Sequence, residues 1–273
     1  MSHWTIEKPG QLTFGPVSHL SVRIVAGRLA VLASDGPPTL DVSDAGTPPL
    51  VVTHDEDGRL TVAYKDLTWE GILGWLRPGN RITTATLTVP KDCPVQVGVI
   101  SASAVVAGFE ARTNVKSVSG EIVLDGVSGD VSAETVSGSV ESRGLAGDLS
   151  FTSVSGELTV AGGSPHRLRA NTVSGRITAD LDLAPTGHVT LNSVSGAIVV
   201  RLPQTVDSDV TLRSTSGSLH AAFPGLETNN RPAARSLTGR IGGGMASVKA
   251  TTVSGDVTLL SKESANQRNG EWA

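Results

Sequence analysis

Cysteine, aromatic residues and long apolar runs are all scarce in this chain of 273 residues. With Cys93 alone, no disulfide can form within the chain. Only 3% of residues are aromatic, so a core must be built from aliphatic side chains. No stretch approaches the roughly 18 apolar residues of a membrane span, and the first residues lack the basic start and apolar run of a secretory signal. We therefore expect a cytoplasmic protein.

Net charge and the spacing of possible metal ligands speak against several kinds of partner and cofactor. A formal charge of −4 and a pI near 5.9 speak against nucleic acid as a partner, which normally requires a basic face. The six histidines show no close spacing with a second metal ligand. The glycine run 242–244 does not lead into the lysine and hydroxyl of a phosphate-binding loop. We expect no nucleic-acid partner, no metal and no cofactor.

Glycine, by contrast, is abundant, with 31 residues, and eight of these glycines lie in copies of one phrase. The copies read SVSGEI, TVSGSV, SVSGEL, TVSGRI, SVSGAI, STSGSL, SLTGRI and TVSGDV. Their glycines are Gly120, Gly138, Gly156, Gly175, Gly196, Gly217, Gly239 and Gly255, at steps of 18, 18, 19, 21, 21, 22 and 16. Such a period predicts a solenoid, in which each repeat buries its apolar face against its neighbours.

Every copy has an apolar residue two positions after its glycine, and every copy except STSGSL, which has Thr215, also has one two positions before it. Val154 and Leu158 show this around Gly156. Residues two apart in an extended chain face the same side, so both are predicted to point inward. The glycine is predicted to form a corner, with the preceding hydroxyl bonded to the backbone of the turn. A weaker corner halfway through the repeats precedes a further apolar position. This position is held by Val131, Leu149, Leu168, Val189 and Val210.

Short strands rich in Val, Ile, Thr and Leu, without long amphipathic helical runs, predict an all-β fold. We expect a single-stranded parallel β-helix, or β-solenoid, of about 18–22 residues per coil. Regular coils are predicted for residues 96–260. Residues 1–95 are expected to form irregular N-terminal coils or a cap, with a separate small β domain as the alternative. Residues 261–273 are polar without periodicity and are predicted to be a disordered tail.

The segment 66–79 departs from the repeats and carries two of the four tryptophans. Its large apolar side chains are Trp69, Ile72, Leu73 and Trp75. Tryptophan with apolar companions is typical of partner surfaces and membrane interfaces, so these four residues are the partner-binding candidates. The alternative is a lid that covers an end or side of the solenoid and prevents strand pairing between molecules.

Acidic residues at the corners suggest an enzymatic alternative, because other parallel β-helices cleave polysaccharides with acidic clusters. Stacked coils bring corner side chains about 5 Å apart, close enough for paired carboxylates to act as acid and base. The other interpretation is that these acidic residues are solvated turn residues, since they alternate with Arg, Ser and Ala and no aromatic platform for a sugar accompanies them. We favour solvated turn residues and expect no catalytic residues. The carboxylates concerned are Glu121, Glu157, Asp256, Asp130, Asp148 and Asp209.

The recurring [ST]VSG[DE][IV] phrase, with its GVSGDV corner at 126–131, resembles the bacterial β-strand-repeat "putative adhesin" family, also called the toastrack domain. The resemblance covers at least residues 95–260. It implies a β-solenoid that serves as a non-catalytic, adhesin-like scaffold for a protein partner. Relatives in phage-shock-like systems imply a link to the envelope-stress response, with membrane contact only peripheral because this sequence lacks their anchor. The oligomeric state is left open.

Overall fold

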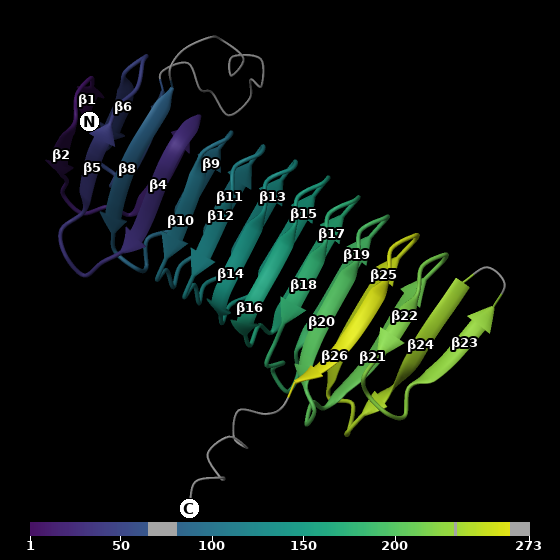
Figure 1. Ribbon diagram of the computed structural model, residues 1–273. Coiled ribbons are helices and arrows are strands. Elements are labelled where there is room, and N and C mark those ends of the chain that lie inside the picture. The colour runs from purple at the N-terminus through teal and green to yellow at the C-terminus, as the bar shows by residue number, and fades with distance from the viewer. Residues whose placement is uncertain (65–80, 232–233, 263–273) are drawn as a thin grey trace, which may run out of the picture. The chain divides into compact units, whose positions relative to one another are not determined.

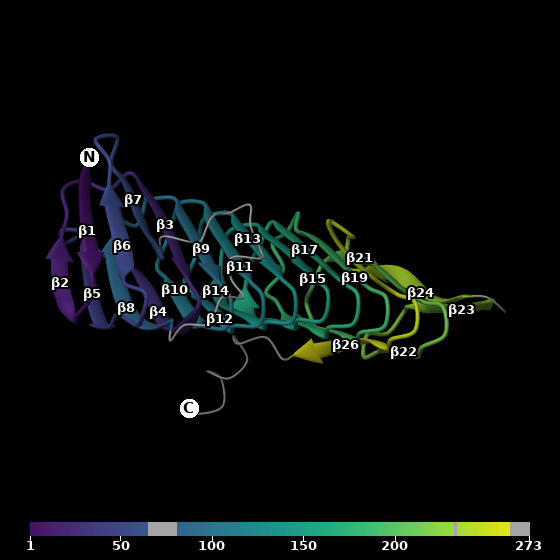
Figure 2. The same cartoon turned by 90° about the horizontal axis from the view of Figure 1, so that it is seen from above.

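The computed structural model describes residues 1–64, 81–231 and 234–262, and the chain divides into two compact units, Met1–Val140 and Glu141–Ala273. All regular structure in the described residues is β-strand, which confirms the predicted all-β class. Strands of each unit lie in two layers, here called sheet A and sheet B (Figure 1 and Figure 2). A sheet A strand, a corner and the sheet B strand that follows make one coil.

Parallel coils make up most of the first unit, and antiparallel strands close one end of it. Its strands β1 and β2 pair antiparallel with β6 and β5. The spatial order in sheet A is β1 (Ser2–Ile6), β6 (Leu50–His54), β7 (Arg59–Tyr64), β3 (His19–Ile24), β9 (Val95–Val99), β11 (Thr113–Ser117) and β13 (Val131–Thr135). The order in sheet B is β2 (Gly10–Thr13), β5 (Thr39–Asp44), β8 (Ile82–Val89), β4 (Ala26–Ala33), β10 (Ser103–Ala107) and β12 (Ile122–Asp125).

The second unit has the same two layers. Its sheet A order is β15 (Leu149–Ser153), β17 (Arg167–Thr172), β19 (His188–Ser193), β25 (Ala246–Thr252), β21 (Ser208–Ser214), β24 (Ala234–Ile241) and β23 (Glu227–Arg231). Its sheet B order is β14 (Val140–Leu145), β16 (Leu158–Gly163), β18 (Ile177–Asp180), β20 (Ile198–Pro203), β26 (Val257–Lys262) and β22 (Leu219–Ala221). Strand β14 starts at the last residue of the first unit.

The last coil along the chain is not the last coil of the stack. Strand β25 pairs in parallel with both β19 and β21, so that Val189 and Val210 flank Val248. Figure 1 shows the yellow strands β25 and β26 lying among green strands from earlier in the chain. Gly239 corrects a second expectation, because its SLTGRI phrase forms no corner. It lies within β24, which runs antiparallel to β21.

The core is a double row of aliphatic side chains between the sheets. The predicted halfway residues Leu149, Leu168 and Val189 are at most 1% exposed. Side chains two residues after the corner glycine, such as Ile177 and Ile198, are fully buried. These inward positions therefore confirm the predicted repeat register after each corner. Strands β3, β4, β6, β7 and β8 lie upstream of the regular repeats.

Candidate interaction surfaces

A buried hydroxyl closes the main corner of each coil in the second unit. The amide of Gly196 donates to Ser193 Oγ at 2.7 Å, and the amide of Gly175 donates to Thr172 Oγ1 at 3.0 Å. Ser193 and Thr172 are 7% and 6% exposed, so each hydroxyl lies inside the corner. The remaining coils repeat the bond in the pairs Gly156–Ser153, Gly217–Ser214 and Gly255–Thr252.

Because this hydroxyl points inward, the valine that follows it points outward. The prediction that the residue two positions before the glycine faces the interior is therefore wrong. Four such valines in the second unit are 48–50% exposed, and we call them the valine edge. They are Val154, Val173, Val194 and Val253. In the first unit Val136 is likewise 49% exposed.

Backbone hydrogen bonds hold successive members of the valine edge in register. The amide of Val194 donates to the carbonyl of Val173 at 3.2 Å, and the amide of Val253 donates to that of Val194 at 3.1 Å. The serine before each glycine supports this ladder, since Ser195 Oγ donates to the Val173 carbonyl at 3.3 Å. The sequence had led us to expect a bond from this serine to its own turn, but the serine bonds the neighbouring coil instead. The valine edge is therefore held in register from coil to coil.

On the sheet B side, one side chain per coil lies just beyond the exposed serine that follows each edge valine. In spatial order these residues are Glu157, Arg176, Ala197, Asp256 and Ser218. All three charged members are exposed, and Asp256 Oδ1 also accepts the Ser218 amide at 2.7 Å. The valine edge thus carries charges of both signs along one border.

The predicted partner-binding residues Trp69, Ile72, Leu73 and Trp75 lie outside the described residues. The positions on either side of this segment belong to a buried cluster of the first unit. Tyr64 is 1% exposed and its hydroxyl is hydrogen-bonded to Thr83 Oγ1. Arg81 is 5% exposed, with its guanidinium carbon 6.0 Å from the Tyr64 ring centre. Tyr64 and Arg81 therefore belong to a well-packed part of the first unit.

Corner carboxylates of the second unit do not form the pairs that the enzymatic alternative requires. Asp148 lies 3.6 Å from the guanidinium of Arg167, and Asp209 accepts from Nε of Arg240 at 2.9 Å. At the main corners, the flanking row places Arg176 beside Glu157, while Ala197 and Ser218 flank Asp256 in the stack. In the described part of this unit, these carboxylates face cations or neutral residues, as solvated turn residues do.

Contacts between serine and histidine also lack a catalytic arrangement. In the second unit Ser247 Oγ lies 3.2 Å from His188 Nδ1, and the strand register places Asp209 on the far side of Ser247. A nucleophilic triad needs the histidine between the serine and the carboxylate. Here the serine is in the middle. This row is therefore not assembled for acyl transfer.

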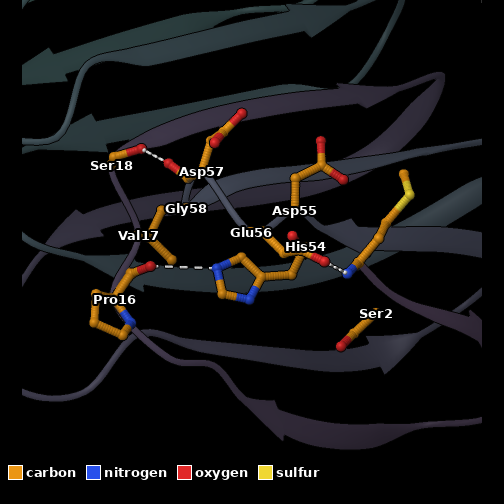
Figure 3. Close-up of a pocket in the computed structure, with 10 residues that line it drawn as sticks. Ser2, Pro16, Val17, Ser18, His54, Asp55, Glu56, Asp57 and Gly58 are labelled. Carbon is orange, nitrogen blue, oxygen red and sulfur yellow. Dashed lines mark hydrogen bonds and ion pairs between the residues drawn. The ribbon is translucent and has the colours of Figure 1, made fainter.

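An open pocket of about 480 Å³ lies in the first unit at the turn between β6 and β7 (Figure 3). Ser18 Oγ donates to the Asp57 carbonyl at 2.7 Å, so its proton is not available to His19 Nδ1, 3.2 Å away. His54 Nε2 lies 3.2 Å from the Pro16 carbonyl, which can only accept. The polar groups of this pocket thus hold the turn together.

The described residues support neither a metal site nor a membrane-spanning helix. Within them, no group of three or more His, Cys, Asp and Glu side chains is placed to hold a metal ion. The same residues contain no helix that could cross a membrane.

Comparison with known proteins identifies the fold. A model of the family described as Toastrack DUF4097 matches residues 39–260. A solved structure of a "putative adhesin" from Bacteroides fragilis is similar, with a TM-score of 0.51, 10% identity, and 95% of this chain and 97% of that chain covered. No match was found among curated proteins.

Two further solved structures also match. One is a "putative cell adhesion protein" from Clostridium sporogenes, with a TM-score of 0.26, 11% identity, and 93% of this chain and 100% of that chain covered. The other is a "putative lipid binding protein" from Parabacteroides distasonis, with a TM-score of 0.31, 12% identity, and 93% and 97% covered.

Proposed function

Because the chain belongs to the toastrack family, we propose that it is a non-catalytic, adhesin-like scaffold that acts through its surface. The observation that carries this proposal is the use made of the corner groups. Buried hydroxyls close the turns, and corner carboxylates of the second unit lie beside cations or neutral residues. What remains exposed and regular is the valine edge. An enzyme would instead need reactive groups gathered in an enclosed site.

The finer form of the proposal assigns partner binding to Trp69, Ile72, Leu73 and Trp75. Its support is the concentration of large apolar side chains in a sequence that is otherwise 3% aromatic. We expect the partner to be a protein, with membrane contact only peripheral. A link to the envelope-stress response is supported by the family resemblance alone.

The test uses the full chain as bait on both fractions of a cell lysate. Trp69→Ser with Trp75→Ser should abolish retention of the partner that the wild-type chain retains, while melting temperature stays unchanged. Trp272→Ser is the control, because it removes a tryptophan from the polar tail predicted by the sequence. Flotation with phosphatidylglycerol vesicles should then separate a lipid surface from a protein partner.

Two outcomes would contradict the proposal. If the double variant retains the same proteins as wild type, the tryptophan segment is not the binding site. If the chain cleaves a glycan and Asp130→Asn with Asp148→Asn removes this activity, the scaffold is not merely a binder.

A further inference from the structure

We propose that the valine edge of the second unit is a contact between two copies of this chain, arranged antiparallel about a two-fold axis at Val194. The valine edge comprises Val154, Val173, Val194 and Val253, each about half exposed. A contiguous apolar row with charged residues along its border is typical of interaction sites.

The spacing of the row indicates what can cover it. Successive coils lie about 4.8 Å apart, so the valines repeat at that distance. An α-helix repeats its surface every 5.4 Å or so, and an extended strand presents the same face roughly every 6.6 Å, so both lose register after a few side chains. A second copy has the same repeat over its whole length. Its valines can therefore stay opposite those of the first copy along the whole row.

The charges along the border favour one arrangement of the two copies. An axis perpendicular to the stack and passing through Val194 places Val173 opposite Val253 of the second copy. The same rotation brings Arg176 opposite Asp256, and it does so twice because the contact is isologous. Neither residue is committed to an ion pair elsewhere in the described residues. Glu157 then faces the uncharged Ser218, so no like charges meet within the second unit.

The alternative axis, parallel to the stack, fits less well. It would place the sheet B border of one copy opposite the sheet A border of the other. Arg176 would then face Asn171, and Glu157 would face Thr152, so neither ion pair would form. The charges therefore select the antiparallel arrangement.

The contact is narrow, because one side chain per coil forms its centre. Interfaces that bury less than about 1,200 Å² are typical of transient pairs. We therefore expect a reversible dimer that forms at high micromolar concentration and weakens with salt, since its border is charged.

Sedimentation of the full chain over a wide concentration range tests the dimer. Val194→Lys should weaken self-association at least about tenfold, because it puts two cations together on the axis. Leu260→Lys is the matched control, since Leu260 is 40% exposed on sheet B and lies away from the valine edge. It should leave self-association unchanged. Melting curves of both variants check that the fold is retained.

Charge exchange tests the register of the two copies. Arg176→Asp and Asp256→Arg should each weaken the dimer, because each puts like charges together. The double exchange should restore most of the affinity, since it recreates the pairs with opposite sign. If the double variant is as weak as the singles, the antiparallel register is wrong.

Disulfide trapping locates the axis directly. A cysteine introduced by Val194→Cys should form a disulfide with the same cysteine of the second copy under mild oxidation. One introduced by Val173→Cys should crosslink to a Val253→Cys chain but not to itself. The native Cys93 is 2% exposed and does not compete. Leu260→Cys is the control and should not crosslink. Equal crosslinking of the Val194→Cys and Leu260→Cys chains, or a wild-type chain that stays monomeric at all concentrations, would overturn the proposal.

Discussion

The hydroxyl of Ser193 accepts the amide of Gly196 at 2.7 Å inside the corner that joins β19 to β20. Removing it by Ser193→Ala leaves a buried amide without this partner, and we expect a loss of about 1–3 kcal/mol in unfolding free energy. Urea unfolding measures the change. Ser195→Ala is the control, because that hydroxyl is exposed. A loss as large at Ser195 would show that the buried hydroxyl has no special part in the corner.

Close stacking of the corners leads to a second prediction. A Cβ built on Gly196 would overlap the carbonyl oxygen of Gly175 in the neighbouring coil. Gly196→Ala should therefore destabilise the fold by about 1–3 kcal/mol or more, since backbone atoms would have to move. For comparison, Gly10→Ala in β2 meets nothing closer than 4.0 Å and should be nearly neutral. Thermal melting of the two variants gives the comparison, and equal melting temperatures would contradict the prediction.

The repeat phrase predicts more of the coil interior than of the corner itself. The apolar residue two positions after the glycine is buried as expected, because a regular strand starts there. The valine two positions before the glycine is exposed, because the chain bends between the two and alternation is not carried across a bend. The missed signal is the first letter of the phrase. It is Ser or Thr in every copy, and at Ser193 and Thr172 it supplies the buried hydroxyl.

Coil order could not be predicted, because the coils are nearly interchangeable. In a simple sequential stack, Val189 would pair with its next copy, Val210. In the structure it pairs in the same way with Val248, which comes later in the chain. Nothing in one phrase specifies which neighbour it selects. Gly239 shows the converse, because a near-copy of the phrase lies in a straight antiparallel strand where Leu226 packs against it. The tryptophan segment stays a prediction.

An ion-pair network should make the second unit sensitive to acid. Burial tends to raise the pKa of Asp180, but hydrogen bonds from Arg201 and Lys262 outweigh it and hold that pKa below its usual value. The folded-state pKa is the lower one, so the carboxylate stabilises the fold above its unfolded pKa. This stabilisation is lost as pH falls through the folded value.

Lys262→Met should therefore cost about 1 kcal/mol at neutral pH and flatten the acid side of the stability curve. Lys249→Met, which removes an exposed lysine with no ion pair among the described residues, should do neither. Urea unfolding at several pH values distinguishes the two. Parallel curves for wild type and Lys262→Met would show that the network does not contribute.

The thiol of Cys93 should be unreactive in the folded chain. Burial raises its pKa to about 11, and the nearby charge of Asp92 acts in the same direction. Because the thiolate is the reactive form, alkylation at neutral pH should be slow in buffer and fast in guanidinium chloride. Mass spectrometry of the alkylated chain measures both rates. Similar rates in the two solutions would mean that this part of the first unit opens readily.

Hydrogen exchange can test the inserted last coil, because ordinary chain ends fray first. Strand β25 has a hydrogen-bonded neighbour on each side, β19 and β21, whereas β23 pairs with β24 alone among the described strands. Peptides from 246–252 should therefore exchange more slowly than peptides from 227–231, although they lie nearer the end of the chain. The protection of 246–252 should match that of β19, its neighbour in the stack. If 246–252 exchanges first, the coil lies at an edge, and the order of strands in the second unit is wrong.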